Sequence, residues 1–328
     1  MNEIEQIIKY FNNFDYIPTT EEIYTFYPKK INMDTVGEYY KKNQKLKIKS
    51  QKFQKEREKR KRISENKINL INTYIKLLSN FLQIKLVGLS GTVAMNNAQE
   101  NDDIDLFIIT AKDRLWTGRL VAILLAQLLN LRRKRNSNNV IASESCLADE
   151  RGNLVTKKMV YINGIASLRL RRVRLGFAQG KLPRNYIKVK DKVCLNLFFD
   201  ENNLQVPKYK QTEYVAHEVL QMKPLINKDQ AYERFLKANE WTFVFFPNAA
   251  EDFRGLKADF HKCQRKSTMN LLKSISNKVE QMLKSFQLLL IRKHKTTEII
   301  TDSQLWFFPE DYERKMQGLS QIKRADSR

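Results

Sequence analysis

Two carboxylates stand two residues apart in the apolar run DIDLFIIT, at Asp103 and Asp105. A strand places residues two apart on the same face of a sheet, so both side chains can bind one cation while Ile104 and Leu106 point into the core. Carboxylates that leave coordination positions for water and phosphate oxygens are typical ligands of Mg²⁺. The spacing therefore predicts a site for Mg²⁺ or Mn²⁺ that could serve phosphoryl transfer.

A short turn, Ser90-Gly91-Thr92, follows the apolar run KLVGL. Glycine permits close approach of the backbone at what we expect to be a helix start, where amide groups and a hydroxyl can bind a β- or γ-phosphate. We therefore predict that Ser90, Gly91 and Thr92 bind the phosphates of a nucleotide such as ATP.

Together, LSGT, a gap of ten residues and DID within LFII resemble the nucleotidyltransferase superfamily typified by DNA polymerase beta and the minimal nucleotidyltransferases. That pattern is hydrophobic-Gly-Gly/Ser, a short gap, then Asp-hydrophobic-Asp/Glu-hydrophobic, and Thr92 here replaces the usual serine. The resemblance implies an α/β fold with a small mixed sheet. It also implies Mg-dependent transfer of a nucleotide from a nucleoside triphosphate (NTP) to a hydroxyl on a small molecule, a protein or an RNA end.

The whole chain also resembles a group of bacterial nucleotidyltransferase-domain proteins that carry an N-terminal winged-helix-like segment. The matching parts are FDY near residue 14, SGTVAMNNAQENDDID, the RLW helix, KVCLNLFFDE, AHEVLQMKPL and the closing FFPEDY. The match breaks at about residues 140–187. This block is either an insertion or an irregular loop of the same fold.

The chain departs from the superfamily at the third carboxylate, which active members place on a later strand to bind metal and help deprotonate the attacking hydroxyl. In KVCLNLFFDE the position with the expected flanks is Asn196. Asp200 lies four residues further on the same face, about 13 Å away at strand rise. Asp191, Glu144 and Asp149 are weaker substitutes. The alternatives to an enzyme are therefore a non-catalytic nucleotide-binding or DNA-binding regulator on this fold, and an antitoxin-like protein acting on a partner.

Other polar side chains have both a functional and a structural interpretation. His217 could bind phosphate or transfer protons, or it could be a buried structural histidine. Lys223 and Arg119 are candidates for triphosphate contacts. RNA or DNA contacts, or a solvated strand, would explain the four arginines Arg169, Arg171, Arg172 and Arg174.

The 328 residues carry a net charge of +23, with a pI near 9.8. Such a field attracts polyanions, so RNA or DNA is an expected partner of the basic surface, although an AT-biased genome would also enrich lysine. The three cysteines, Cys146, Cys194 and Cys263, lack a CxxC pair and fit a reducing cytoplasm. His261 and Cys263 without a second pair do not predict zinc.

No membrane contact is expected, because the longest apolar run, residues 120–131, is shorter than the ~20 residues that cross a bilayer. The start of the chain shows no export signal. We therefore expect a cytoplasmic protein.

The elements expected around these residues suggest three segments. Residues 1–62 should form three short helices, as a winged-helix-like module or a small helical cap. Thr19 and Glu22 form a capping-box pattern that places a helix start immediately after Pro18. The basic run over residues 41–62 is either a solvated helix or a contact for a polyanion. Residues 63–206 should hold the nucleotidyltransferase core, including an amphipathic helix with Ile71, Tyr74, Ile75, Leu78 and Leu82 on one face. A helical region is expected over residues 207–328, closed by aromatic anchors at residues 306–308.

Overall fold

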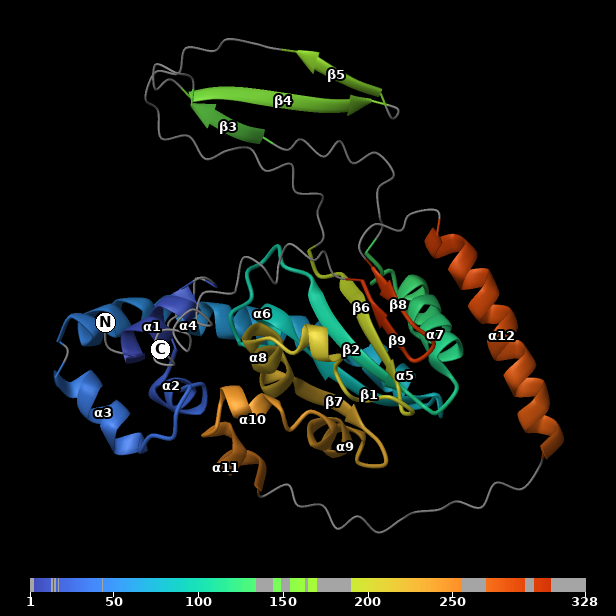
Figure 1. Cartoon of the computed structure of the whole chain (residues 1–328), viewed down its shortest axis with the longest axis horizontal. Coiled ribbons are helices and arrows are strands. Elements are labelled where there is room, and N and C mark those ends of the chain that lie inside the picture. Colours follow the sequence, from blue (N-terminus) through green and yellow to red (C-terminus); the bar gives the residue numbers. More distant parts are fainter. Residues whose placement is uncertain are drawn as a thin grey trace. The chain divides into compact units, whose positions relative to one another are not determined.

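The computed structural model describes residues 3–12, 14, 16, 18–42, 44–133, 144–148, 154–162, 165–169, 190–254, 270–292 and 298–307 (Figure 1). Two compact units divide the chain. One consists of residues 1–132 together with 189–328, and the other of residues 133–188.

A six-stranded mixed sheet forms the centre of the larger unit, in the order β7-β1-β2-β6-β9-β8. Its strands are β1 Ile84–Leu89, β2 Ile104–Thr110, β6 Val193–Asp200, β7 Lys223–Asn227, β8 Ile299–Ile300 and β9 Gln304–Trp306. β2 and β6 run parallel, and the other neighbouring strands run antiparallel. The predicted α/β class and the strands in KLVGL, DIDLFIIT and KVCLNLFF are confirmed, while the nucleotidyltransferase type of the sheet stays a prediction.

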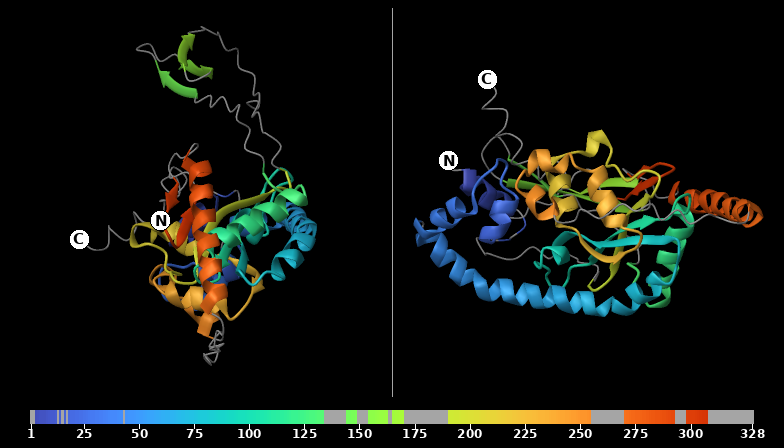
Figure 2. Two further views of the ribbon diagram at one scale, coloured as in Figure 1. Left: turned by 90° about the vertical axis from the view of Figure 1, so that its right-hand side faces the viewer. Right: turned by 90° about the horizontal axis from the view of Figure 1, so that it is seen from below.

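Helices cover both faces of this sheet (Figures 1 and 2). They are α5 Asn72–Ser79, α7 Leu115–Leu128 and α12 Asn270–Arg292 on one face, and α8 Glu213–Gln221 and α9 Ala231–Ala238 on the other. Burial on both faces explains why β1 and β2 are almost continuously apolar. Along β2, Leu106 and Ile108 pack on the first side, and Phe107 and Ile109 pack on the second.

The expected N-terminal helices are α1 Glu3–Asn12, α2 Thr20–Thr25 and α3 Met33–Lys42. The predicted capping box at the start of α2 is present, since Glu22 N donates to Thr19 Oγ1 at 3.0 Å and Thr19 N donates to Glu22 Oε2 at 2.7 Å. α4, Gln44–Leu70, follows α3, and in the described part of residues 3–70 every regular element is a helix. The winged-helix character of this segment stays a prediction.

The helical form expected for the basic run is present in α4, which extends from the N-terminal helices to α5 (Figure 2, right). Its inner face uses cations as structural donors. Arg57 donates to the Tyr16 hydroxyl and to Glu22, and Arg60 donates to Asn97 Oδ1 at 2.8 Å. The basic run therefore joins the N-terminal helices to the loop after β1.

The amphipathic helix predicted from Ile71 onward is α5, and Ile71, Tyr74 and Leu78 are fully buried as expected. The prediction was wrong for Leu82, which is 75% exposed. The helix ends at Ser79, so Leu82 lies in the turn before β1 and outside the helical face.

The C-terminal segment is only partly helical, because β7, β8 and β9 also join the sheet. Its helices α10 Thr242–Phe245, α11 Ala249–Arg254 and the long α12 accompany α8 and α9. Trp306 is buried in β9, as expected of an anchor, and Phe308 lies outside the described residues. The helical region expected over residues 207–328 thus also supplies three strands, which the sequence did not predict because a strand such as the five-residue KPLIN is too short to show a period.

The smaller unit contains an antiparallel sheet in the order β3-β4-β5, formed by β3 Glu144–Ala148, β4 Leu154–Ile162 and β5 Ile165–Arg169. Ala148 pairs with Leu154, so β3 and β4 are consecutive antiparallel strands, and the residues that connect them, 149–153, lie outside the described ones. In the larger unit, Val193 N donates to Leu131 O at 2.7 Å. The chain thus leaves and re-enters the core at neighbouring positions, as an insertion does. Of the four predicted nucleic-acid arginines, only Arg169 belongs to a described strand.

The predicted segments 1–62, 63–206 and 207–328 are not separated by contacts, since residues of all three belong to the larger unit. Their value as domain boundaries stays a prediction. The unit boundary at residues 133–188 is close to the expected block at 140–187.

His217 on α8 is fully buried, among the rings of Tyr10, Phe11, Phe14 and Phe26. Neither ring nitrogen has a hydrogen-bond partner in the described part of the chain, and burial lowers the pKa of His217 to about 3. A role in phosphate binding or proton transfer does not fit this enclosure. His217 is a structural histidine that holds α1 and α2 against α8.

This environment predicts acid lability. Because the folded state disfavours the charged imidazole, His217 contributes stability above its ordinary pKa of 6.5 that is lost as pH falls toward about 3. His217→Leu removes the titrating ring, so we expect urea unfolding to show a smaller loss of stability between pH 7 and pH 4.5 in the variant. Equal losses in the two proteins would contradict the assignment.

Candidate functional site

Three side chains of types that can bind a metal meet at one end of β2 and β6. Asp103 immediately precedes β2, Asp105 lies on it, and Cys194 on β6 pairs with Asp105 in parallel register. One ligand atom from each residue lies within 4.8 Å of the other two. The aspartates are half-buried and Cys194 is buried. The structure therefore brings the two predicted carboxylates together and adds a thiol that sequence reasoning did not assign to the site.

A register shift between β2 and β6 accompanies the pairing of Asp105 with Cys194, whereas Asn196 was expected at the third-ligand position. Asp105 pairs with Cys194 and Phe107 pairs with Leu197, so two steps on β2 oppose three on β6. Such an irregularity breaks the alternation of faces on which the sequence argument depended. Asn196 lies within this stretch, and its backbone carbonyl accepts a hydrogen bond from Phe307 N at 2.9 Å.

Asp200 does not join the cluster, as its separation of about 13 Å along the strand implies. It pairs with Thr110 at the other end of β6, and its carboxylate accepts hydrogen bonds from the backbone amides of Asn202 at 2.8 Å and Arg114 at 3.3 Å. Burial raises the pKa of Asp200, and these amide bonds oppose that shift. Its role is to stabilise the turn after β6 and the entry to α7.

The weaker substitutes also lie elsewhere. Asp191 forms an ion pair with Lys67 at 2.8 Å. The side chain of Glu144 and the whole of Asp149 lie outside the described residues.

Gly91 brings the turn after β1 against the carboxylate of Asp105. It begins α6, Gly91–Ala94, with a φ of 64°, a left-handed conformation that side chains other than glycine rarely adopt. A Cβ at this position would lie 2.7 Å from Asp105 Oδ2. Glycine is therefore required at position 91 for two reasons. The backbone conformation is left-handed, and the Asp105 carboxylate occupies the space that a Cβ would need.

The two hydroxyls of the turn differ. Thr92 Oγ1 donates to Asp102 Oδ2 at 3.0 Å, and Gln99 N donates to the same oxygen at 2.8 Å. Thr92 thus stabilises the loop that leads to β2. Ser90 precedes α6 without a side-chain cap bond, and its amide donates to Asp105 O at 3.0 Å.

Glu218 on α8 is a site residue that sequence reasoning missed. Its Oε2 accepts a hydrogen bond from Gly91 N at 3.4 Å, so a carboxylate contacts the amide predicted to bind phosphate. Burial raises the pKa of this half-buried side chain to about 7, while hydrogen bonds from Gly91 and Tyr214 oppose the shift. The signal in the sequence was a carboxylate next to His217 within the mostly apolar segment AHEVL.

Lys223 and Arg119, the two cationic side chains expected to contact a triphosphate, lie in different surroundings. Lys223 pairs with Leu89 next to the turn, and its Nζ donates to Asn96 Oδ1 at 3.1 Å. Burial lowers the pKa of Lys223. The charge of Glu22 opposes this shift, and the charge of Lys61 adds to it.

Arg119 donates to Gln287 Oε1 at 2.5 Å, and its guanidinium lies 5.0 Å from the centre of the Phe307 ring. Burial, followed by the charge of Arg132, lowers the pKa of Arg119 to about 10. These contacts join α7 to α12 and to the end of β9, so Arg119 serves packing there.

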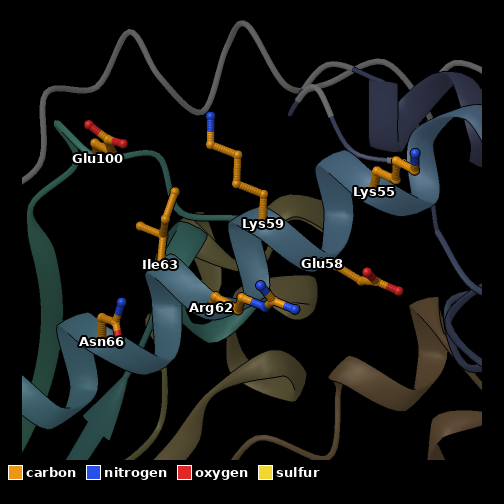
Figure 3. Close-up of a pocket in the computed structure, with 7 residues that line it drawn as sticks. All are labelled: Lys55, Glu58, Lys59, Arg62, Ile63, Asn66 and Glu100. Carbon is orange, nitrogen blue, oxygen red and sulfur yellow. The ribbon is translucent and has the colours of Figure 1, made fainter.

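A pocket of about 310 Å³ lies between α4 and the loop before β2 and contains none of the cluster residues. It is lined by Lys55, Glu58, Lys59, Arg62, Ile63, Asn66 and Glu100 (Figure 3). Cations and carboxylates mix in it, so it is not a matching site for a triphosphate. A polyanion contact by α4 stays a prediction.

Comparisons with protein-family models, with curated proteins and with solved structures found no match for this chain. In the described part of the chain, no helix combines the length and the apolar character needed to cross a bilayer.

The position of Glu218 predicts a pH effect opposite to that of His217. A carboxyl whose pKa is raised from 4.5 to about 7 contributes stability below pH 4.5 that is lost as pH rises through about 7. Glu218→Gln cannot ionise, so its stability relative to the native chain should increase from pH 5 to pH 8 in urea unfolding.

The matched control is Glu213→Gln, which removes a carboxylate from the first turn of the same helix. If both variants give the same pH dependence, the effect comes from the charge of α8 and not from the contact with Gly91.

Proposed function

We propose that this protein is a metal-dependent nucleotidyltransferase that transfers a nucleotide from an NTP to a hydroxyl acceptor. The observation that carries the proposal is the approach of Gly91 to Asp105, with a would-be Cβ 2.7 Å from the carboxylate oxygen. This contact joins the predicted phosphate turn to the predicted metal ligands. A triphosphate bound at the turn would therefore lie beside a cation at Asp103 and Asp105.

The donor set fits the expected cation in part. Asp103 and Asp105 supply the oxygen ligands that Mg²⁺ or Mn²⁺ prefers, whereas the third donor within reach is the sulfur of Cys194. A bound divalent cation would neutralise phosphate charge during transfer. Asp103 and Asp105 would hold and orient it, and their half-buried position limits competition from bulk water.

Phosphate binding would use the Gly91 amide, the Ser90 hydroxyl and the Lys223 ammonium. The pairing of Lys223 with Leu89, one residue before Ser90, supports this role. The Gly91 amide now donates to Glu218, so a phosphate oxygen and the Glu218 carboxylate compete for one donor. Protonation of Glu218 near neutral pH would relieve that competition.

The acceptor hydroxyl must also lose a proton. Neither Cys194 nor Asn196 supplies the third carboxylate of active superfamily members, so we expect a slow or acceptor-selective enzyme. A nucleic-acid acceptor fits the net charge of +23.

The second candidate is a regulator that binds a nucleotide without turnover. The thiol of Cys194 beside Asp105 is the observation that favours it, because a carboxylate is expected there in an active enzyme. Both candidates require the metal–nucleotide site, and only the first requires transfer.

Because both candidates require the metal–nucleotide site, both predict that ligand binding raises the thermal stability of the chain. NTP with Mg²⁺ or Mn²⁺ should raise the melting temperature, and a ligand at 100 times its Kd adds about 2.7 kcal/mol to the free energy of unfolding. Asp103→Asn should remove most of this rise, while Asp302→Asn, an exposed carboxylate paired with Lys284, should keep it. An undiminished rise in Asp103→Asn would place the metal elsewhere.

Transfer itself is tested by incubating the chain with each radiolabelled NTP, Mg²⁺ or Mn²⁺, and total RNA or cell extract. The proposed enzyme labels an acceptor, and Asp103→Asn does not. A melting rise without any labelled product would favour the regulator.

A further inference from the structure

The cluster of Asp103, Asp105 and Cys194 differs from a pure carboxylate site in one donor atom. Its two oxygens and one sulfur lie within 4.8 Å of one another. A cation with ligand distances of about 2.0–2.3 Å holds its donors closer together than 4.8 Å, so the three side chains would move toward one another as they bind it. The parallel pairing of Asp105 with Cys194 fixes the sulfur on this side of the sheet.

The turn at Gly91 borders the cluster closely. A Cβ on residue 91 would lie 2.7 Å from Asp105 Oδ2, so only glycine lets the backbone approach this carboxylate.

The donor atoms determine which cation fits. Mg²⁺ takes hard oxygen ligands in near-ideal octahedral geometry and keeps several waters. A thiolate is a soft ligand that favours borderline ions such as Zn²⁺, which also accepts carboxylates. Three protein ligands leave a fourth tetrahedral position open for water or a substrate oxygen, as in catalytic zinc sites.

We propose that Asp103, Asp105 and Cys194 bind a divalent cation of the Zn²⁺ or Co²⁺ class in preference to Mg²⁺, with the Cys194 sulfur as a direct ligand. The thiol releases its proton to solvent as the sulfur–metal bond forms. The inference deepens the proposed function by naming its metal, and it requires neither NTP nor transfer.

Cobalt titration of the full chain tests this directly, since a thiolate ligand gives Co²⁺ a sulfur-to-metal charge-transfer band in the near ultraviolet. Cys146→Ser with Cys263→Ser leaves Cys194 as the remaining thiol of the three. This protein should show the band, and excess Mg²⁺ should not displace the Co²⁺. Adding Cys194→Ser should remove the band and weaken Co²⁺ binding about tenfold or more, because even partners outside the ligand shell affect affinity 10–100-fold.

Two further variants complete the test. Asp103→Asn should also weaken Co²⁺ binding while leaving the thiol in place, and Cys194→Asp should shift the preference toward Mg²⁺. Thermal melts confirm that each variant is folded. A missing band in the chain that retains Cys194, or a band that Asp103→Asn leaves at unchanged affinity, would overturn the inference.

Failure here is distinguishable from failure of the proposed function. An Asp103-dependent melting rise with Mg²⁺ and NTP but no cobalt band would leave the nucleotide site intact and reject the sulfur ligand. A cobalt band without any response to NTP would keep the metal site and reject nucleotide transfer.

Discussion

The contact between Gly91 and Asp105 is the constraint on which the proposed site depends. β1 and β2 pair antiparallel up to Leu89 and Leu106, and Ser90 N then donates to Asp105 O, so the turn after β1 meets the start of β2. Only a residue without Cβ, in a left-handed conformation, fits between them. One local backbone arrangement thus sets the distance between the turn proposed to bind phosphate and the aspartates proposed to bind a metal.

Two helices hold that arrangement. On α4, the buried Lys67 ammonium donates to the carbonyls of Asp102 and Glu100 and to Asp191, which fixes the loop entering β2. On α8, the ring of His217 is enclosed by aromatic side chains of the N-terminal helices, and the next residue, Glu218, accepts from Gly91. The N-terminal helices therefore influence the site through packing, without needing to contact a substrate.

The sequence predicted the parts of the fold that depend on local pattern. Apolar runs predicted β1, β2 and β6, and Gly91 was expected at a helix start, where α6 begins. The partner of Asp105 could not be predicted, since a register shift between Cys194 and Leu197 exists only when β6 pairs with β2. Glu218 was missed for a similar reason, because its contact spans 127 positions of the chain. The strands after residue 222 were missed because they are short and take their stability from the sheet edge that receives them.

The central claim is that a cation and a triphosphate bind together at Asp103, Asp105 and Gly91. The most direct measurement is a crystal structure of the chain with Mn²⁺ and a non-hydrolysable NTP analogue, with the ion located by its anomalous scattering. The account predicts an anomalous peak within coordination distance of both aspartates and a phosphate oxygen in place of Glu218 on the Gly91 amide. An ion at Glu58 and Glu100 in the α4 pocket, with no density at the aspartates, would contradict it.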